Sequence, residues 1–127
     1  MKLLLDTHVF FWFVTNSPLL EARHRQLIAD QNHLKVVSAV TGWEIALKFK
    51  LGKWPDAAAL LPDLPGLVAR SNLQSIDLTL RQAEMAGSLD LIHRDPFDRM
   101  LVAQSLDLDM PVLTVDSALA RLGCKTL

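Results

Sequence analysis

The chain of 127 residues contains a single cysteine, Cys124. One cysteine excludes an internal disulfide and suits a reducing compartment, so we expect a cytoplasmic protein. Long apolar runs are also missing. Asp6, Thr7 and His8 interrupt the apolar start of the chain, and no small-residue cleavage site follows. The later run 9–14 is too short to cross a bilayer, so we expect neither a signal peptide nor contact with a membrane.

Several familiar site patterns are absent as well. The cysteine and the four histidines, His8, His24, His33 and His93, show no zinc-binding spacing. The chain has no glycine-rich phosphate loop and no Gly-x-Ser-x-Gly nucleophile elbow. Its net charge is −1, without the general basic excess of many nucleic-acid-binding proteins. Any basic surface must therefore be local.

Short strand-like segments alternate with helical ones along the chain. Strands are predicted at 2–5, 34–37, 74–78, 112–115 and 124–127, and helices at 8–15, 19–31, 39–51, 67–71, 80–87, 96–106 and 117–122. This alternation predicts an α/β fold with a mainly parallel sheet. Half of the residues are apolar, and no linker or repeat interrupts the pattern, so residues 1–127 are predicted to form one domain.

Four acidic residues lie at comparable places in this pattern: Asp6, Glu44, Asp98 and Asp116. Each comes just after, or one helical turn beyond, a predicted strand or its crossover. The carboxyl ends of parallel strands share one edge of a sheet, where ligands bind. Four carboxylates at one edge repel one another unless a cation lies between them, and Mg²⁺ and Mn²⁺ prefer such oxygen ligands. The sequence therefore predicts a metal-dependent enzyme.

Each acid also has an ordinary structural explanation. Asp6 could be a turn residue at a strand end, and Asp116 could cap the short helix that follows it. Glu44 could be a surface residue paired with Lys48 one helical turn later. Its apolar neighbours favour partial burial instead, which would require a partner.

The segment 93–104 carries two acids, which physical chemistry separates. Asp95 followed by Pro96 is a strong helix start, with Asp as N-cap and Pro in the first turn. Asp98 falls in the first turn, where the helix dipole favours a carboxylate, and could point into a site. We favour Asp98 as a metal ligand and Asp95 as a cap or supporting residue.

The ordered set of these motifs resembles the PIN domain, and more narrowly the VapC-type toxins of toxin–antitoxin pairs. The PIN-like residues are Leu3–Thr7, Ser38 with Glu44, Asp98 with Ala103 and Gln104, and Leu113–Asp116. The VapC-like residues are Trp43–Lys48, Gly52 with Lys53, and Asp95–Arg99. Each short motif is unspecific alone, but the set follows the family's order over nearly the whole chain.

This resemblance implies a three-layer α/β/α fold and an endoribonuclease that depends on Mg²⁺ or Mn²⁺. Metal-activated water would cleave the RNA backbone and leave a 5′-phosphate and a 3′-hydroxyl. The resemblance also implies a cognate antitoxin and a homodimer. A family hydroxyl falls on Thr7 or Thr114, and the role of Asp95 beside the metal stays open. The family's metal-binding and catalytic residues fall on Asp6, Glu44, Asp98 and Asp116.

Contacts to RNA are expected from basic residues beside the motifs: Lys48, Lys50, Lys53, Arg94 and Arg99. For any single one of them, an ordinary solvated surface residue is the favoured interpretation. Trp43, Trp54 and Phe97 could stack on a base or belong to the core. The apolar run 9–14 could be core, an antitoxin groove or a self-association face.

Two other functions fit the sequence less well. An aspartyl phosphatase or phosphotransferase would use Asp6 as its nucleophile. Such sites usually need a second acid two residues later, where this chain has His8. A catalytically silent protein-binding module could keep the same fold, but the presence of all four acids argues against it.

Overall fold

A four-stranded parallel sheet lies at the centre of the computed structural model, which describes all residues, Met1–Leu127. The strands follow the order β3-β2-β1-β4 across the sheet. Their bounds are β1 (Lys2–Leu5), β2 (Leu34–Ser38), β3 (Gln74–Ile76) and β4 (Val112–Leu113). Leu4 on β1 lies in register with Val36 on one side and Val112 on the other. The predicted parallel sheet is confirmed.

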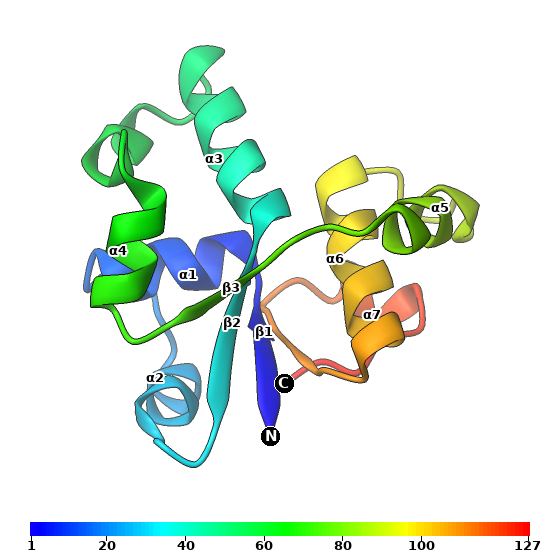
Figure 1. Cartoon of the computed structure of the whole chain (residues 1–127), viewed down its shortest axis with the longest axis horizontal. Helices are drawn as coiled ribbons and strands as arrows, with labels where there is room; N and C mark the ends of the chain where they lie inside the picture. The colour runs from blue at the N-terminus through cyan, green and yellow to red at the C-terminus, as the bar shows by residue number, and fades with distance from the viewer.

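Helices cover both faces of this sheet (Figure 1). On one side lie α1 (Thr7–Val14), α2 (Ala22–Ala29) and α4 (Leu64–Arg70), and on the other α5 (Leu80–Ser88), α6 (Pro96–Leu108) and α7 (Ala118–Arg121). The helix α3 (Ala39–Lys50) continues from β2 beyond the carboxyl edge of the sheet, and the 3₁₀ helix η1 (Pro55–Leu60) packs against it. The fold is therefore three-layer α/β/α, as the resemblance implied.

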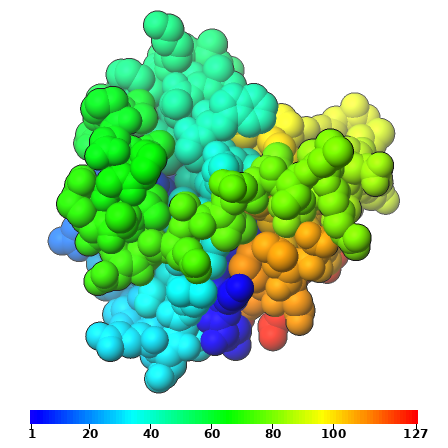
Figure 2. Space-filling model, viewed as in Figure 1, coloured from blue at the N-terminus to red at the C-terminus, as the bar shows by residue number.

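The segment after α4 carries the chain across the molecule. Figure 2 shows it running over the near face, from the α4 side to the α5 side. β3 forms the edge of the sheet within this crossing. The crossing segment therefore joins the two helical layers along the edge of the sheet next to β2.

The two faces of β1 belong to two separate cores. Leu3 and Leu5 pack with Phe10 of α1, whereas Leu4 packs with Leu101 of α6. Side chains alternate along a strand, and a strand covered on both faces is apolar throughout. Asp6 is the first polar residue after this strand, so it lies where the chain leaves both cores.

Helix starts are where the sequence was most informative. Ser38 caps α3, Thr79 caps α5 and Asp95 caps α6, each through a side-chain oxygen that accepts a backbone N–H. α4 begins earlier than predicted, because Asp63 accepts the N–H of Gly66 and starts the helix there. α2 is shorter than predicted and begins only at Ala22.

The carboxyl-terminal strands are shorter than predicted. β4 ends at Leu113, and the chain bends at Val115 on its way to α7. The segment 124–127 pairs with β4 through one isolated bridge, between Val112 and Thr126. None of the helices combines the length and apolar character that crossing a membrane requires.

Candidate metal centre

The four predicted acids line one cleft at the carboxyl edge of the sheet. Asp6 follows β1, Glu44 lies on α3, Asp98 lies in the first turn of α6, and Asp116 follows β4. The cleft has a volume of about 400 Å³ and is lined by Asp6, His8, Trp12, Glu44, Lys48, Asp95, Asp98, Val115 and Asp116. The parallel topology thus brings together acids that are far apart in the sequence.

Asp6 is held in a fixed orientation at the base of the cleft. The carboxylate is only 6% exposed. Its Oδ1 accepts the N–H of Thr7 at 2.7 Å, and its Oδ2 accepts the hydroxyl of Thr114 at 2.6 Å. Burial raises the pKa of Asp6, while these two hydrogen bonds oppose the shift. Each carboxylate oxygen keeps a further lone pair, which a cation could use.

Glu44 is buried and has two protein partners. It is 4% exposed, its Oε1 accepts the Thr7 hydroxyl at 2.6 Å, and its Oε2 pairs with the ammonium of Lys48. The predicted pairing with Lys48 is therefore present, but inside the cleft. Burial alone would lower the pKa of Lys48; the hydrogen bond to Glu44 and the charges of nearby acids outweigh it and raise that pKa. Lys48 therefore stays charged and offsets one carboxylate.

Asp95 and Asp98 have the different environments that the helix-cap argument predicts. Asp95 Oδ1 accepts the N–H groups of Phe97 and Asp98, at 2.9 and 3.3 Å. The side chain of Asp98 projects into the cleft and is 16% exposed. Burial, followed by the charges of Asp6 and Asp95, raises the pKa of Asp98 to about 6. The hydrogen bond to His93 opposes this shift.

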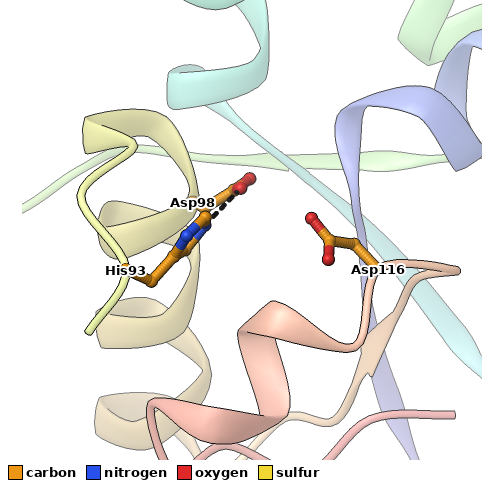
Figure 3. Close-up of side chains that lie close together, drawn as sticks. All are labelled: His93, Asp98 and Asp116. Carbon is orange, nitrogen blue, oxygen red and sulfur yellow. Dashed lines mark hydrogen bonds and ion pairs between the residues drawn. The ribbon is translucent and has the colours of Figure 1, made fainter.

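His93 lies beside Asp98, in the loop between α5 and α6 (Figure 3). Its Nε2 is 2.8 Å from Asp98 Oδ2. Asp116 faces this pair across the cleft, and one potential ligand atom from each of the three residues lies within 4.8 Å of the others. His93 is not among the site residues predicted from the sequence. The available signal was its position just before the capping Asp95, which keeps it close to the first turn of α6.

Asp116 combines both interpretations that the sequence left open. Its Oδ1 accepts the N–H of Ala118 at the start of α7, at 2.9 Å, and its own N–H donates to the Thr114 hydroxyl at 3.0 Å. The side chain is exposed and lines the cleft. It is therefore a helix-start residue that also faces the other acids.

The cleft is suited to a hard divalent cation. Five carboxylates, from Asp6, Glu44, Asp95, Asp98 and Asp116, line it together with a single ammonium group. Burial is the largest cause of the raised pKa of Asp6 and of Asp98, and a bound cation would favour the ionised form of both. Oxygen donors of this kind fit Mg²⁺ or Mn²⁺.

A second hollow adjoins the acidic cleft and shares two of its residues. It is lined by His8, Lys48, Lys53 and Trp54, of which His8 and Lys48 also line the cleft. The rings of His8 and Trp54 stack with centroids 5.0 Å apart. Lys53 is exposed. Positive and aromatic groups therefore lie directly beside the acids.

The remaining aromatic and basic residues have mixed environments. Trp43 is exposed and packs edge-on against the buried Phe97, with ring centroids 4.9 Å apart. Lys50 and Arg94 are exposed. In the apolar run 9–14, the first two residues are buried in the core and the other four are half-buried against it.

Arg99 is not available to RNA, contrary to the expectation from the sequence. The residue is only 7% exposed. Its guanidinium donates hydrogen bonds to five backbone carbonyls, those of Ala86, Gly87, Leu89, Asp90 and His93. Arg99 lies one residue after Asp98 but points into the protein, where it binds the loop before α6.

Residues 3–124 match the PIN domain family. The chain therefore belongs to this family, whose members are nucleases. No curated protein matches the chain in sequence.

The fold is similar to that of several solved structures, which include VapC-type proteins. VapBC2 from Rickettsia felis, bound to a DNA fragment from its promoter, is similar with a TM-score of 0.72 and 16% identity, over 100% of this chain and 97% of that one. VapC20 from Mycobacterium tuberculosis, a toxin that cleaves the sarcin–ricin loop, gives 0.66 and 16%, over 98% of each chain. FitAcB from Neisseria gonorrhoeae gives 0.63 and 18%, over 98% and 96%. At sequence identities this low, the structural similarity shows a shared fold alone.

Proposed function

We propose that this protein is the toxin of a type II toxin–antitoxin pair, an endoribonuclease that depends on Mg²⁺ or Mn²⁺. The convergence of Asp6, Glu44, Asp98 and Asp116 on one cleft carries the proposal. Membership of the PIN family and the fold likeness to VapC20 support it. The cleaved bond is an RNA phosphodiester, and the products carry a 5′-phosphate and a 3′-hydroxyl.

In this proposal, Asp6, Glu44, Asp98 and Asp116 would hold the cation. The bound cation supplies an activated water and stabilises negative charge on the phosphate. Thr114 orients two of the acids, because its hydroxyl donates to Asp6 and accepts the N–H of Asp116.

Three further residues support this set. The Thr7 hydroxyl fixes Glu44, and Asp95 fixes the first turn of α6 and so directs Asp98 into the cleft. Lys48 offsets the charge of Glu44 and could also approach a phosphate from the rim.

The RNA backbone would run from the acidic cleft into the adjoining hollow. Lys48 and Lys53 are the candidate phosphate contacts there, and Trp54 with His8 offers an aromatic surface for a base. Arg94 is a further candidate, because it is exposed beside His93 and Asp95. Cations beside an acidic centre would counter its repulsion of RNA.

The proposed partner is a cognate antitoxin, supported by the fold likeness to VapBC2. We further propose that residues 1–127 act as one domain and assemble as a homodimer.

The phosphatase alternative is weakened by the environment of Asp6. That carboxylate is buried and both of its oxygens accept hydrogen bonds, so it is poorly placed as a nucleophile.

The proposal is tested by the variants Asp6→Asn and Asp98→Asn, with Asp56→Asn as a matched control. Asp56 is an exposed acid on η1, away from the cleft. Wild type and control should arrest growth on induction and cleave RNA in Mg²⁺ or Mn²⁺. The two cleft variants should be non-toxic and lose cleavage by about 100-fold or more. Toxicity and cleavage equal to wild type in both cleft variants would refute the proposal, and phosphorylation of Asp6 would favour a phosphatase.

A further inference from the structure

We propose that His93 is a nitrogen ligand of the cation, next to Asp98 and Asp116, and that Arg99 is the residue that positions it. This inference rests on the proposed metal-dependent function and adds one ligand of a different chemical type. It also predicts which metals the centre prefers. Neither residue belongs to the four acids predicted from the sequence.

The separations of the three side chains suit a shared ion. Ligands of an octahedral ion lie about 2.1 Å from it, so neighbouring ligands are about 3 Å apart and opposite ones about 4.2 Å. His93 Nε2 and Asp98 Oδ2 form a hydrogen bond of 2.8 Å in the metal-free protein. The same spacing is expected of neighbouring ligands, so a cation that displaces the shared proton would be able to bind both atoms. Asp116 offers an oxygen within 4.8 Å of both atoms. Its exposed side chain can move the few tenths of an ångström that separate this spacing from the spacing of opposite ligands.

The direction of the side chains agrees with these separations. His93 and Asp98 point from the loop before α6 and from its first turn toward the same space (Figure 3). Asp116 points into that space from the opposite side, after β4. The Nε2 atom of His93 faces Asp98, and once the proton of their hydrogen bond is released, the neutral imidazole nitrogen is a good ligand for a divalent metal.

Arg99 fixes the loop that carries His93. Its Nη1 donates to the carbonyls of His93 and Asp90, at 2.9 and 2.6 Å, and its Nη2 donates to Leu89 and Gly87, at 2.6 and 3.3 Å. Its Nε donates to Ala86 at 3.0 Å. These are all five N–H donors of a guanidinium, and each binds a backbone carbonyl of the segment 86–93.

This arrangement has a clear physical basis. The carbonyls at the end of α5 have no partners within the helix and carry the negative end of its dipole, so a buried cation is favoured there. Arg99 follows Asp98 directly on α6. The same turn of α6 therefore presents Asp98 to the cleft and, through Arg99, holds the backbone of His93 beside it.

A nitrogen ligand changes the metal preference of the centre. Mg²⁺ strongly favours oxygen, whereas Mn²⁺ also accepts imidazole. We expect Mn²⁺ to bind the wild-type protein more tightly than Mg²⁺. The variant His93→Gln should reduce the ratio of the two affinities by about 10-fold, mainly by weakening Mn²⁺.

Pulsed electron paramagnetic resonance of Mn²⁺ bound to the full chain tests the ligand directly. The wild type should show hyperfine coupling to a ¹⁴N nucleus of histidine. His93→Gln should remove this coupling, while His8→Gln, which changes the other histidine of the cleft, should retain it. Mn²⁺ bound without ¹⁴N coupling, or coupling lost only in His8→Gln, overturns the role of His93 and leaves the proposed function standing. Absence of any Mn²⁺ or Mg²⁺ binding to the wild type instead overturns the proposed function.

The positioning role of Arg99 needs separate measurements. Arg99→Lys keeps the charge but not the five-donor geometry, so it should lower the Mn²⁺/Mg²⁺ affinity ratio as His93→Gln does. Hydrogen exchange of the wild type gives a readout that does not depend on the folding of that variant. Adding Mn²⁺ should slow amide exchange in residues 91–94, together with the segments around Asp98 and Asp116. Unchanged exchange in 91–94, or an unchanged affinity ratio in a folded Arg99→Lys protein, contradicts the proposal.

Discussion

The hydroxyl of Thr114 donates to Asp6 Oδ2 across 2.6 Å and so connects the end of β4 to the end of β1. The same hydroxyl oxygen accepts the N–H of Asp116 at 3.0 Å. One small side chain therefore orients two of the four acids. The other two acids also have specific partners: Glu44 pairs with Thr7 and Lys48, and Asp98 with His93. The four acids are therefore largely oriented before any cation binds.

Replacing Thr114 by valine should loosen this arrangement without changing the volume of the side chain. Asp6 loses a donor and the N–H of Asp116 loses its acceptor, which should destabilise the protein by about 1–3 kcal/mol. Metal affinity should fall by about 10-fold to 100-fold. Calorimetric titration with Mn²⁺ and urea unfolding measure the two effects. Thr15→Val, at an exposed helix end, serves as the control, and wild-type metal affinity in Thr114→Val would contradict the assigned role.

The raised pKa of Asp98 predicts a pH dependence of the metal-free protein. The folded state holds this proton more tightly than the unfolded chain, whose carboxyl has its ordinary pKa of 3.8. The resulting stabilisation is present in full below pH 3.8 and is lost as the pH rises through about 6. Asp98→Asn cannot ionise, so with EDTA at neutral pH it should melt at a higher temperature than the wild type.

A thermal unfolding series from acid to neutral pH checks this expectation. The difference between wild type and Asp98→Asn should grow as the pH passes through about 6. Excess Mg²⁺ should reverse the order at neutral pH, because it stabilises only the protein that retains its ligand. A metal-free Asp98→Asn protein that melts below the wild type at neutral pH would be inconsistent with an uncompensated carboxylate.

Arg94 and Arg99 should behave oppositely, although they flank the same segment, Asp95–Asp98. Arg99→Ala leaves five buried carbonyls without their donor and should destabilise the protein by several kcal/mol, at about 1–3 kcal/mol for each group left unsatisfied. Arg94 is exposed, so Arg94→Ala should leave stability unchanged within about 0.5 kcal/mol. Urea unfolding measures both variants.

Arg94→Ala should instead weaken RNA binding and lessen its dependence on salt, by about 0.7 in the slope of log affinity against log salt concentration. Fluorescence anisotropy with a labelled RNA at several salt concentrations gives this slope. An unchanged slope would remove Arg94 from the proposed RNA path. Normal stability of Arg99→Ala would contradict the structural role of that residue.

The pair formed by Lys48 and Glu44 predicts strong coupling. Lys48→Met leaves Glu44 buried beside other acids without its positive partner, which should cost about 1–3 kcal/mol because Lys48 is still partly solvated. Adding Glu44→Gln should recover most of this loss. A double-mutant cycle by urea unfolding measures the coupling, and additive effects of the two changes would show that the pair contributes little.

The parts of the fold set by local chemistry could be predicted from the sequence. The apolar run before Asp6 predicted β1, and the N-caps Ser38, Thr79 and Asp95 marked three helix starts. These features depend on neighbouring residues alone. The separation of Asp95 from Asp98 was possible for the same reason, because a capping side chain bonds within its own helical turn.

The features that depend on distant contacts could not be predicted in this way. Arg99 resembles a surface cation in sequence, and its burial depends on the path of the loop that ends α5. His93 is isolated in sequence and gains its significance only when β4 brings Asp116 opposite it. The last predicted strand forms only a single bridge, at Thr126. The sequence of one segment does not determine how many residues of it pair with a neighbouring strand.

Titration of Mg²⁺ into metal-stripped protein during cleavage of a labelled RNA tests the central claim most directly. The wild type should be inactive in EDTA and should recover cleavage saturably as Mg²⁺ is added. Asp98→Asn, folded at the same pH, should stay at least about 100-fold slower at every concentration. Cleavage that persists in EDTA, or an Asp98→Asn curve that superimposes on that of the wild type, would contradict the account.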